Sequence, residues 1–178
     1  HPVNADLVIG VPDSGLDAAL GFSRVSHIPY GIGLIKNKYI GRTFISPGQS
    51  SRVDKVKIKL SAVEESVKGK KIVLVDDSIV RGTTSKCIVK ILREAGAKEI
   101  HMRISSPPFL NPCYYGTDID SRENLIACNH SEQETAEIIG ADSLGYLSVD
   151  SLSNLIDCQE YCRACFDGAV SYTHLTLP

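Results

Sequence analysis

Apolar and polar positions alternate along the chain in blocks that predict strands and helices in turn. The run Ile72-Val73-Leu74-Val75 has no polar interruption, which is typical of a strand buried on both faces of a parallel sheet. Similar runs predict strands at 6–11, 32–36 and 99–104. Strands without a polar face need helices on both sides of the sheet.

The segments between and after these strands predict the helices. A helix is expected at 14–25 and another at 83–95, the second ending just before Gly96, which suits a left-handed cap. Two more are expected at 131–139 and 151–158, each starting on a serine that suits capping. The alternation predicts an α/β fold with a doubly wound, mainly parallel sheet flanked by helices.

The strand at 72–75 leads into two carboxylates and a hydroxyl-rich loop. Asp76 and Asp77 can accept hydrogen bonds from vicinal sugar hydroxyls or approach a metal ion. Gly82 lets the backbone come close to a ligand, and 83–85 place hydroxyls and free amides at a helix start, which attracts phosphate. Because open α/β sheets bind ligands at the carboxyl ends of their strands, this loop predicts a ribose 5-phosphate site. An Asp-Asp pair alone would more often be a solvated strand end.

Two further loops suit anions. Residues 10–15 read Gly-Val-Pro-Asp-Ser-Gly between a strand and a helix, although such a turn alone would favour an ordinary connection. Residues 36–42 are basic and include Tyr39; a solvated charged loop is the alternative reading. Three phosphate-suited loops in one α/β frame favour a shared function for all of them.

Composition narrows the class of protein. The chain has 178 residues, with 19 basic and 21 acidic residues interspersed for a net charge of −2. That length fits one domain, and the charge argues against a nucleic-acid partner. No apolar segment is long enough to span a bilayer, and the start at His1 does not resemble a signal peptide. We therefore expect a soluble, cytoplasmic protein.

Cysteines form the last feature with chemical potential. Their uneven placement favours reduced thiols or metal ligation over disulfides. Cys162 and Cys165 have a two-residue spacing that lets two thiolates reach one metal centre. A zinc site and buried free cysteines are the alternatives, and Cys87 is expected in the core. The six cysteines are Cys87, Cys113, Cys128, Cys158, Cys162 and Cys165.

The three loops, in this order, resemble those of type I phosphoribosyltransferases, which use phosphoribosyl pyrophosphate (PRPP). The longer stretches at 10–15, 36–45 and 75–85 resemble one member family, the glutamine PRPP amidotransferases, and the resemblance covers about residues 5–168. It implies transfer of the phosphoribosyl group to ammonia. The products are 5-phosphoribosylamine and pyrophosphate, in the first step of de novo purine biosynthesis.

The resemblance also implies roles for individual residues. The catalytic loop that closes over PRPP would contribute Lys36, Tyr39 and Arg42. Ser14, Asp76 and Asp77 would hold Mg²⁺. The residues expected to bind the substrate are Asp13, Ser14, Gly15, Asp76, Asp77, Ser78, Ile79, Val80, Arg81, Gly82, Thr83, Thr84 and Ser85.

A metal cluster, partners and domain limits are implied in the same way. Cys113, Cys162 and Cys165 resemble three of four ligands of a [4Fe-4S] cluster, the fourth lying upstream of His1. An amino-terminal glutaminase domain would precede the phosphoribosyltransferase domain at 1–168 and supply ammonia from glutamine. Purine nucleotides would act as feedback inhibitors, and the full-length protein would be a homo-oligomer. Residues 169–178 fit no family pattern and are expected to be a non-native or disordered tail.

Two other functions compete with this interpretation. A nucleobase phosphoribosyltransferase of purine salvage would share the ribose 5-phosphate loop but usually lacks the Gly-Arg-Thr-Phe-Ile stretch at 41–45 and the cysteine pair. A PRPP-binding regulator would keep the loops without catalysis. The basic stretch at 36–42 favours turnover over regulation.

Overall fold

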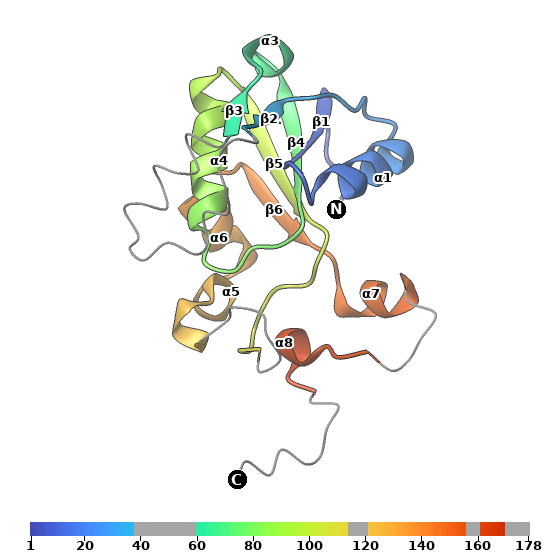
Figure 1. The fold of residues 1–178 in the computed structure, drawn as a ribbon, viewed down its shortest axis with the longest axis vertical. Helices are drawn as coiled ribbons and strands as arrows, with labels where there is room; N and C mark the ends of the chain where they lie inside the picture. The colour runs from blue at the N-terminus through green and yellow to red at the C-terminus, as the bar shows by residue number, and fades with distance from the viewer. Residues whose placement is uncertain (38–59, 114–120, 156–160, 170–178) are drawn as a thin grey trace.

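A computed structural model describes residues 1–37, 60–113, 121–155 and 161–169 (Figure 1). Its centre is a sheet of parallel strands with helices on either side. None of the helices in these ranges combines the length and apolar character that a bilayer span requires.

The parallel sheet has the order β1-β4-β5-β6. Its strands are β1 (Leu7–Gly10), β4 (Lys71–Asp76), β5 (Glu99–Ile104) and β6 (Ser143–Tyr146). All four run in the same direction, so their carboxyl ends meet at one edge. The prediction of a mainly parallel sheet is confirmed, and the expected strands at 6–11, 72–75 and 99–104 match β1, β4 and β5 closely.

The winding of the chain reverses between β1 and β4. After β1, helix α1 (Leu16–Ser26) leads to Tyr30, which forms a parallel bridge to Val8 on the far side of β1 from β4. After β4, helix α4 (Thr83–Glu94) leads the other way, to β5. Such a reversal places the two helices on opposite faces of the sheet, and in open α/β sheets the ligand-binding crevice lies at this point, at the carboxyl ends of the two strands.

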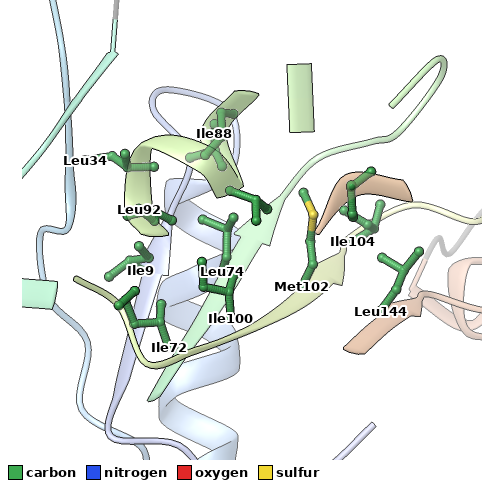
Figure 2. Packing of buried hydrophobic residues seen from close by; sticks show 14 of the residues in the cluster. Ile9, Leu34, Ile72, Leu74, Ile88, Leu92, Ile100, Met102, Ile104 and Leu144 are labelled. Atoms are coloured by element: carbon green, nitrogen blue, oxygen red, sulfur yellow. The ribbon is translucent and has the colours of Figure 1, made fainter. Parts of the chain in front are cut away.

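Two hydrophobic cores confirm this arrangement, because alternate residues of β4 serve different faces. The smaller core joins Val73 and Val75 to Val8 and to Ala19 of α1. The larger core lies under α4 and α6 (Glu132–Ile139) and includes Leu74 (Figure 2). Each fully buried Ile or Leu contributes about 1.5–3 kcal/mol to folding. Large residues of this core that are almost fully buried are Ile9, Ile72, Leu74, Ile88, Leu92, Ile100, Met102 and Ile139.

The strand expected at 32–36 does not join the parallel sheet. It is β2 (Leu34–Lys36), which pairs antiparallel with β3 (Leu60–Ala62) in a separate two-stranded sheet followed by α3 (Glu64–Val67). Gly33 explains the position: a Cβ there would lie 2.8 Å from the Ile9 side chain, so the segment packs across the large core. The pattern of apolar and polar residues at 32–36 could not distinguish a strand of this antiparallel pair from another strand of the parallel sheet.

The helices after β5 agree in part with expectation. Ser131 caps α6 (Glu132–Ile139) with its side chain and Glu134 closes a capping box, so the helix expected at 131–139 is confirmed. The helix expected at 151–158 is α7 (Val149–Leu155), which begins earlier and whose predicted end lies outside the described residues. The remaining short helices are η2 (Arg122–Asn124), α5 (Ile126–Asn129) and α8 (Ala164–Asp167).

Candidate functional site

Asp76 and Asp77 lie at the carboxyl end of β4, beside the crevice where the winding reverses. Asp76 is only 6% exposed, whereas Asp77 is exposed. The Asp77 backbone N–H donates a hydrogen bond of 2.9 Å to Oδ1 of Asp76, and the Ser78 hydroxyl donates one of 3.0 Å to Oδ1 of Asp77. Burial, and then the neighbouring Asp77 carboxylate, raise the pKa of Asp76 to about 7.

Two adjacent carboxylates are therefore held in place without a cation from the described part of the chain to balance them. Such a pair is costly, because desolvation and repulsion both act against the charged forms. It suits a ligand that brings hydroxyl donors or a positive ion. The diol of a ribose supplies the first, and a divalent metal supplies the second.

The loop after these acids is fixed by its contacts with the core beneath it. Ile79 is 2% exposed and anchors the loop, while the Ile126 N–H donates to the Val80 carbonyl at 3.0 Å. Gly82 adopts φ +74°, and a Cβ there would lie 2.7 Å from Cδ1 of Ile126. Only glycine fits this turn, which brings the loop directly into α4 at Thr83.

The start of α4 presents groups that are able to bind an anion. The first N–H groups of a helix have no partner within the helix and carry partial positive charge, so they attract phosphate. Thr83 is exposed and Thr84 half-buried, so both lie where a ligand can reach them, whereas Ser85 is 3% exposed and faces the interior. Arg81 is half-buried beside them. The groups predicted to bind phosphate thus lie together at the helix start, except that Ile79 and Ser85, also predicted to bind the substrate, are buried.

The loop at 11–15 lies against the end of β4. The Val11 N–H donates to the Val75 carbonyl at 2.8 Å, and the Gly15 N–H donates to the Val11 carbonyl at 2.9 Å. A Cβ on Gly15 would lie 2.5 Å from the Val75 carbonyl oxygen, a distance that real Cβ atoms do not show. The Pro12–Asp13 peptide bond is cis. Close packing therefore brings the first and third sequence motifs side by side.

One residue of the basic motif at 36–42 lies beside the 11–15 loop. Lys36, the last residue of β2, forms an ion pair with the carboxylate of Asp13 in the 11–15 loop. Asp13 and Ser14 are exposed, and Gly15 is buried. The basic group expected in catalysis thus lies beside the loop expected to bind pyrophosphate. Tyr39 and Arg42, the other two expected catalytic residues, lie outside the described residues.

The residues fit Mg²⁺ in the way that this ion usually binds. Mg²⁺ keeps several waters and takes one or two protein carboxylates together with substrate oxygens. Asp76 and Asp77 supply such carboxylates, and Ser14 lies in the neighbouring loop. In the described ranges, no three His, Cys, Asp or Glu side chains are placed to share a metal ion. A metal here would need oxygens from the substrate.

The absence of a three-residue metal site in the described ranges also concerns the cysteines. Cys165 is close enough to Cys113 and Cys162 for both thiols to help raise its pKa, although burial is the main cause. The Cys165 carbonyl accepts hydrogen bonds from the N–H groups of Leu110 and Asn111. The structure therefore gathers the three predicted ligands in one region, but their described arrangement is not that of a metal site. Cys87 is buried in the core, as expected.

Sequence reasoning missed two supporting residues. The Ser105 N–H and hydroxyl both donate to the Asp76 carbonyl, at 3.0 and 3.3 Å, and so fix the backbone that carries the acids. Ile126 supports Gly82 from below. Ser105 directly follows β5 and could have been found by asking which residue ends the neighbouring parallel strand. Nothing in the sequence around Ile126 links it to a loop some forty positions earlier.

The chain matches the model of the phosphoribosyl transferase domain over residues 2–105. It is 53% identical over 170 residues to an amidophosphoribosyltransferase of Methanothermobacter thermautotrophicus, covering 94% of this chain and 36% of that protein. An amidophosphoribosyltransferase of Bacillus subtilis is 54% identical over 173 residues, with 93% and 36% covered. The chain thus spans little more than a third of the length of these curated relatives.

A solved structure gives the same result for the fold. Glutamine PRPP amidotransferase from Bacillus subtilis, complexed with ADP and GMP, superposes with a TM-score of 0.81 at 52% sequence identity. The match covers 95% of this chain and 38% of that chain. It therefore confirms the expected fold over almost all of this chain.

Proposed function

The chain belongs to the phosphoribosyl transferase domain family, and from this premise we propose that it carries the phosphoribosyl-transfer site of an amidophosphoribosyltransferase. The reaction is attack of ammonia on the anomeric carbon of PRPP. The new bond joins nitrogen to that carbon, the bond to pyrophosphate breaks, and a proton leaves the nitrogen. The products are 5-phosphoribosylamine and pyrophosphate, as in the first step of purine biosynthesis.

One observation carries the proposal: the 11–15 loop, the end of β4 with the acids after it, and Lys36 lie close together although they are far apart in sequence. The 11–15 loop contacts the end of β4 through the Val75 carbonyl, and Lys36 reaches that loop through Asp13. The acids and the start of α4 follow directly on β4. PRPP has a diol between two phosphate groups, and this arrangement has an acidic pair between two anion-suited loops.

Each part then has a distinct task. Asp76 and Asp77 would accept hydrogen bonds from the ribose hydroxyls, and the loop at 78–85 would enclose the 5-phosphate with backbone amides and hydroxyls. The loop at 13–15 would bind pyrophosphate. Charge grows on the leaving pyrophosphate, so Lys36 beside that loop would stabilise the transition state. We propose Tyr39 and Arg42 as the catalytic partners of Lys36 in a loop that excludes water.

Mg²⁺, when bound with PRPP at Asp76, Asp77 and Ser14, would add positive charge beside the leaving group. Ammonia has a usable lone pair, so the reaction needs no strong general base. Water is the competing nucleophile, and its exclusion protects the activated sugar.

Other features of the full-length relatives are proposals for this chain too. We propose that ammonia comes from glutamine through a separate glutaminase domain, and that purine nucleotides regulate a homo-oligomer. The solved relative bound to ADP and GMP supports nucleotide binding in the family. A [4Fe-4S] cluster on Cys113, Cys162 and Cys165 needs a fourth ligand and a rearrangement of the described thiols. Iron analysis of the full-length parent protein after anaerobic reconstitution tests it, and an iron-free parent would exclude the cluster.

A pyrophosphate-release assay tests the proposed reaction. The chain is incubated with PRPP and Mg²⁺, alone or with ammonia, glutamine or hypoxanthine. Release that depends on ammonia and not on glutamine is the expected result. Release that depends on hypoxanthine would indicate a salvage enzyme, and PRPP binding without release would indicate a regulator; either result contradicts the proposal.

A further inference from the structure

The two edges of the parallel sheet differ. The outer edge of β1 is covered, because Val8 bridges to Tyr30 there. On the opposite side, β6 pairs with β5 alone in the described part of the chain. Open edges present unpaired N–H and C=O groups, and proteins usually protect them with proline, lysine, charged residues or bulges. The strand Ser143-Leu144-Gly145-Tyr146 contains none of these residues. It is short, and the His1 ring packs against Gly145, where a Cβ would lie 2.7 Å from that ring.

The direction of the open backbone groups follows from the printed hydrogen bonds. The Leu147 N–H donates to the Ile104 carbonyl of β5 at 3.0 Å. In a parallel strand, alternate residues direct both polar groups to the same neighbour. Leu144 and Tyr146 therefore point their N–H and C=O away from β5. The Tyr146 carbonyl already accepts a hydrogen bond of 3.0 Å from the His1 ring, so His1 covers this end of the edge, and Leu144 is the residue left for a partner.

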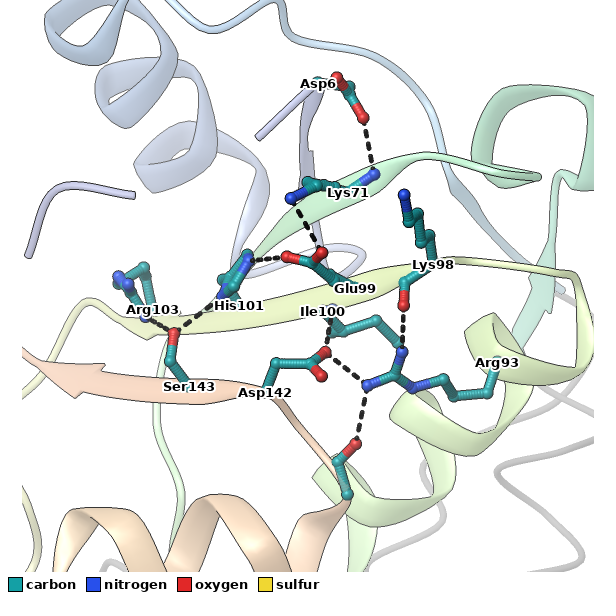
Figure 3. A network of polar contacts seen from close by, with 11 residues as sticks. Asp6, Lys71, Arg93, Lys98, Glu99, Ile100, His101, Arg103, Asp142 and Ser143 are labelled. Atoms are coloured by element: carbon teal, nitrogen blue, oxygen red, sulfur yellow. Dashed lines mark hydrogen bonds and ion pairs between the residues drawn. The ribbon is translucent and has the colours of Figure 1, made fainter. Parts of the chain in front are cut away.

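A hollow of about 380 Å³ lies along the rest of this edge, between β6 and α6. Ser143 and Leu144 both line it, although their side chains belong to opposite faces of the sheet, so the hollow follows the strand's backbone edge. Figure 3 shows β6 at this edge, with Asp142 and Ser143 labelled next to β5. The hollow is thus placed where an added strand would lie.

The lining combines an apolar floor with an acidic rim. Ala136, Ala141 and Leu144 form the floor, and their small or aliphatic side chains offer no hydrogen bonds. Glu132 and Glu137 are exposed on the rim, and neither makes an ion pair with Lys or Arg in the described ranges. Asp142 also lines the hollow but is paired with Arg93. The rim therefore keeps an excess of negative charge.

From the open edge, the apolar floor and the acidic rim together, we infer that β6 and α6 form a docking surface for a short extended segment of a partner protein that carries Lys or Arg. The segment adds beside β6 and exchanges main-chain hydrogen bonds with Leu144. Its long basic side chains lay their aliphatic stems over Ala136 and Ala141 and direct their charges to Glu132 and Glu137. The short strand limits the contact to a few residues, so the affinity is modest.

A synthetic peptide of alternating lysine and valine tests the inference against two control peptides. One control has glutamate in place of lysine, and the other has methylated backbone nitrogens that cannot pair with a strand. Binding is followed by NMR through the amide resonances of the whole chain. We expect the lysine peptide to shift the Leu144 amide with a Kd between about 10 μM and 1 mM, and both controls to bind at least about tenfold more weakly.

Two charge-reversing variants separate a local contact from a general charge effect. Glu137→Lys on the rim is expected to weaken lysine-peptide binding by about tenfold, whereas Glu65→Lys, an exposed helix position of α3 outside the hollow, leaves it unchanged. Glu137→Gln serves if the reversed charge impairs folding, and a smaller loss is expected. Equal binding of the methylated peptide, equal losses in both lysine variants, or shifts confined to other parts of the chain would each overturn the inference.

Discussion

Both ends of the parallel sheet carry acidic residues, but the two acids at the end of β4 have no cation of the described ranges beside them, unlike the acids at the amino ends. At the amino ends of the strands, Glu99 pairs with Lys71, and Asp142 pairs with Arg93 and accepts from the Ile100 N–H at 2.6 Å (Figure 3). At the carboxyl end, Asp76 and Asp77 lie next to each other, and Asp76 is buried. Similar side chains serve cohesion at one end, and at the other end we propose that they bind the ligand.

The pKa values of these acids differ between the two ends in the same way. The hydrogen bond and charge of Lys71 lower the pKa of Glu99. Partial burial would raise the pKa of Asp142, but the Ile100 N–H and Arg93 lower it on balance. Burial and Asp77 raise the pKa of Asp76. The paired acids are charged more readily than a free carboxyl group, whereas the buried Asp76 is charged less readily, as is common for acids in functional sites.

Replacing both acids of the carboxyl end should have the largest effect. Asp76→Asn with Asp77→Asn removes charge-assisted bonds to the ribose hydroxyls, each worth about 1.5–3 kcal/mol, so PRPP binding should weaken by roughly a thousandfold. Calorimetric titration with PRPP and Mg²⁺ measures it. The matched control at the amino end is Glu99→Gln, which should bind PRPP as the unmodified chain does. Unchanged affinity in the double variant would remove these acids from the site.

The close packing of the 11–15 loop gives the next largest effect. Gly15→Ala places a Cβ against the Val75 carbonyl and must displace the loop, which should lower kcat/KM by about a hundredfold, because a shift of about 1 Å has that consequence. Gly21→Ala is the control: its Cβ would meet nothing within 4 Å, and it should stabilise α1 by about 0.5–1 kcal/mol. Full activity in the Gly15 variant would show that loop position is unimportant.

The contribution of one acid to the unfolding free energy should change with pH in opposite directions at the two ends of the sheet. The pKa of Asp76 is raised to about 7 in the folded chain, so between about pH 4 and pH 7 the native state keeps a proton that the unfolded chain has lost. The unfolding free energy therefore falls as pH rises through this window. Asp76→Asn removes that fall and should gain up to about 2 kcal/mol relative to the unmodified chain by pH 7. Urea unfolding without Mg²⁺ measures the gain.

Asp142→Asn provides the opposite case. The pKa of Asp142 is lowered in the folded chain, so its contribution to stability is present above its unfolded pKa and is lost as pH falls through the folded pKa. The variant should be less stable than the unmodified chain at neutral pH, and the difference should shrink in acid. Curves of the same sign for the two variants would contradict the comparison.

The smallest effect is expected from the amino-end cation. Arg93 donates to the Lys98 carbonyl at 2.8 Å and pairs with Asp142, and its side chain is one-third exposed. Arg93→Ala should cost about 1 kcal/mol in unfolding free energy and leave PRPP affinity unchanged. Thermal unfolding and the same calorimetric titration measure both. A large loss of PRPP affinity would mean that the two ends are coupled.

Local chemistry explains what sequence could predict. The uninterrupted run at 72–75 predicted a buried strand, which is confirmed, and the glycine at 82 has the φ that its turn requires. The ligand-binding role of the acids after the strand stays a prediction. The strand β6 was missed, because Ser143 and Gly145 weaken its β pattern. The antiparallel role of 34–36 was missed too, because pairing partners distant in sequence leave no local signal.

The contacts that the 11–15 loop makes with Lys36 and with the end of β4 could not be predicted from the sequence for the same reason. Nothing in the spacing of Asp13 and Lys36 shows that their side chains pair, and the steric need for Gly15 depends on the Val75 carbonyl across the crevice. The resemblance of ordered motifs supplied what spacing could not, since it placed all three loops around one ligand. Tyr39 and Arg42 stay predictions from that resemblance.

Hydrogen–deuterium exchange of the full chain, with and without PRPP and Mg²⁺, tests most directly the proposal that PRPP binds at the carboxyl ends of the parallel strands. With PRPP bound, amide exchange is expected to slow at 11–15 and 76–85, where the backbone amides enclose the ligand. No change is expected at 98–101 or 140–143, at the opposite end of the sheet. Protection at the amino end, or no protection at the 76–85 loop under saturating PRPP, would contradict it.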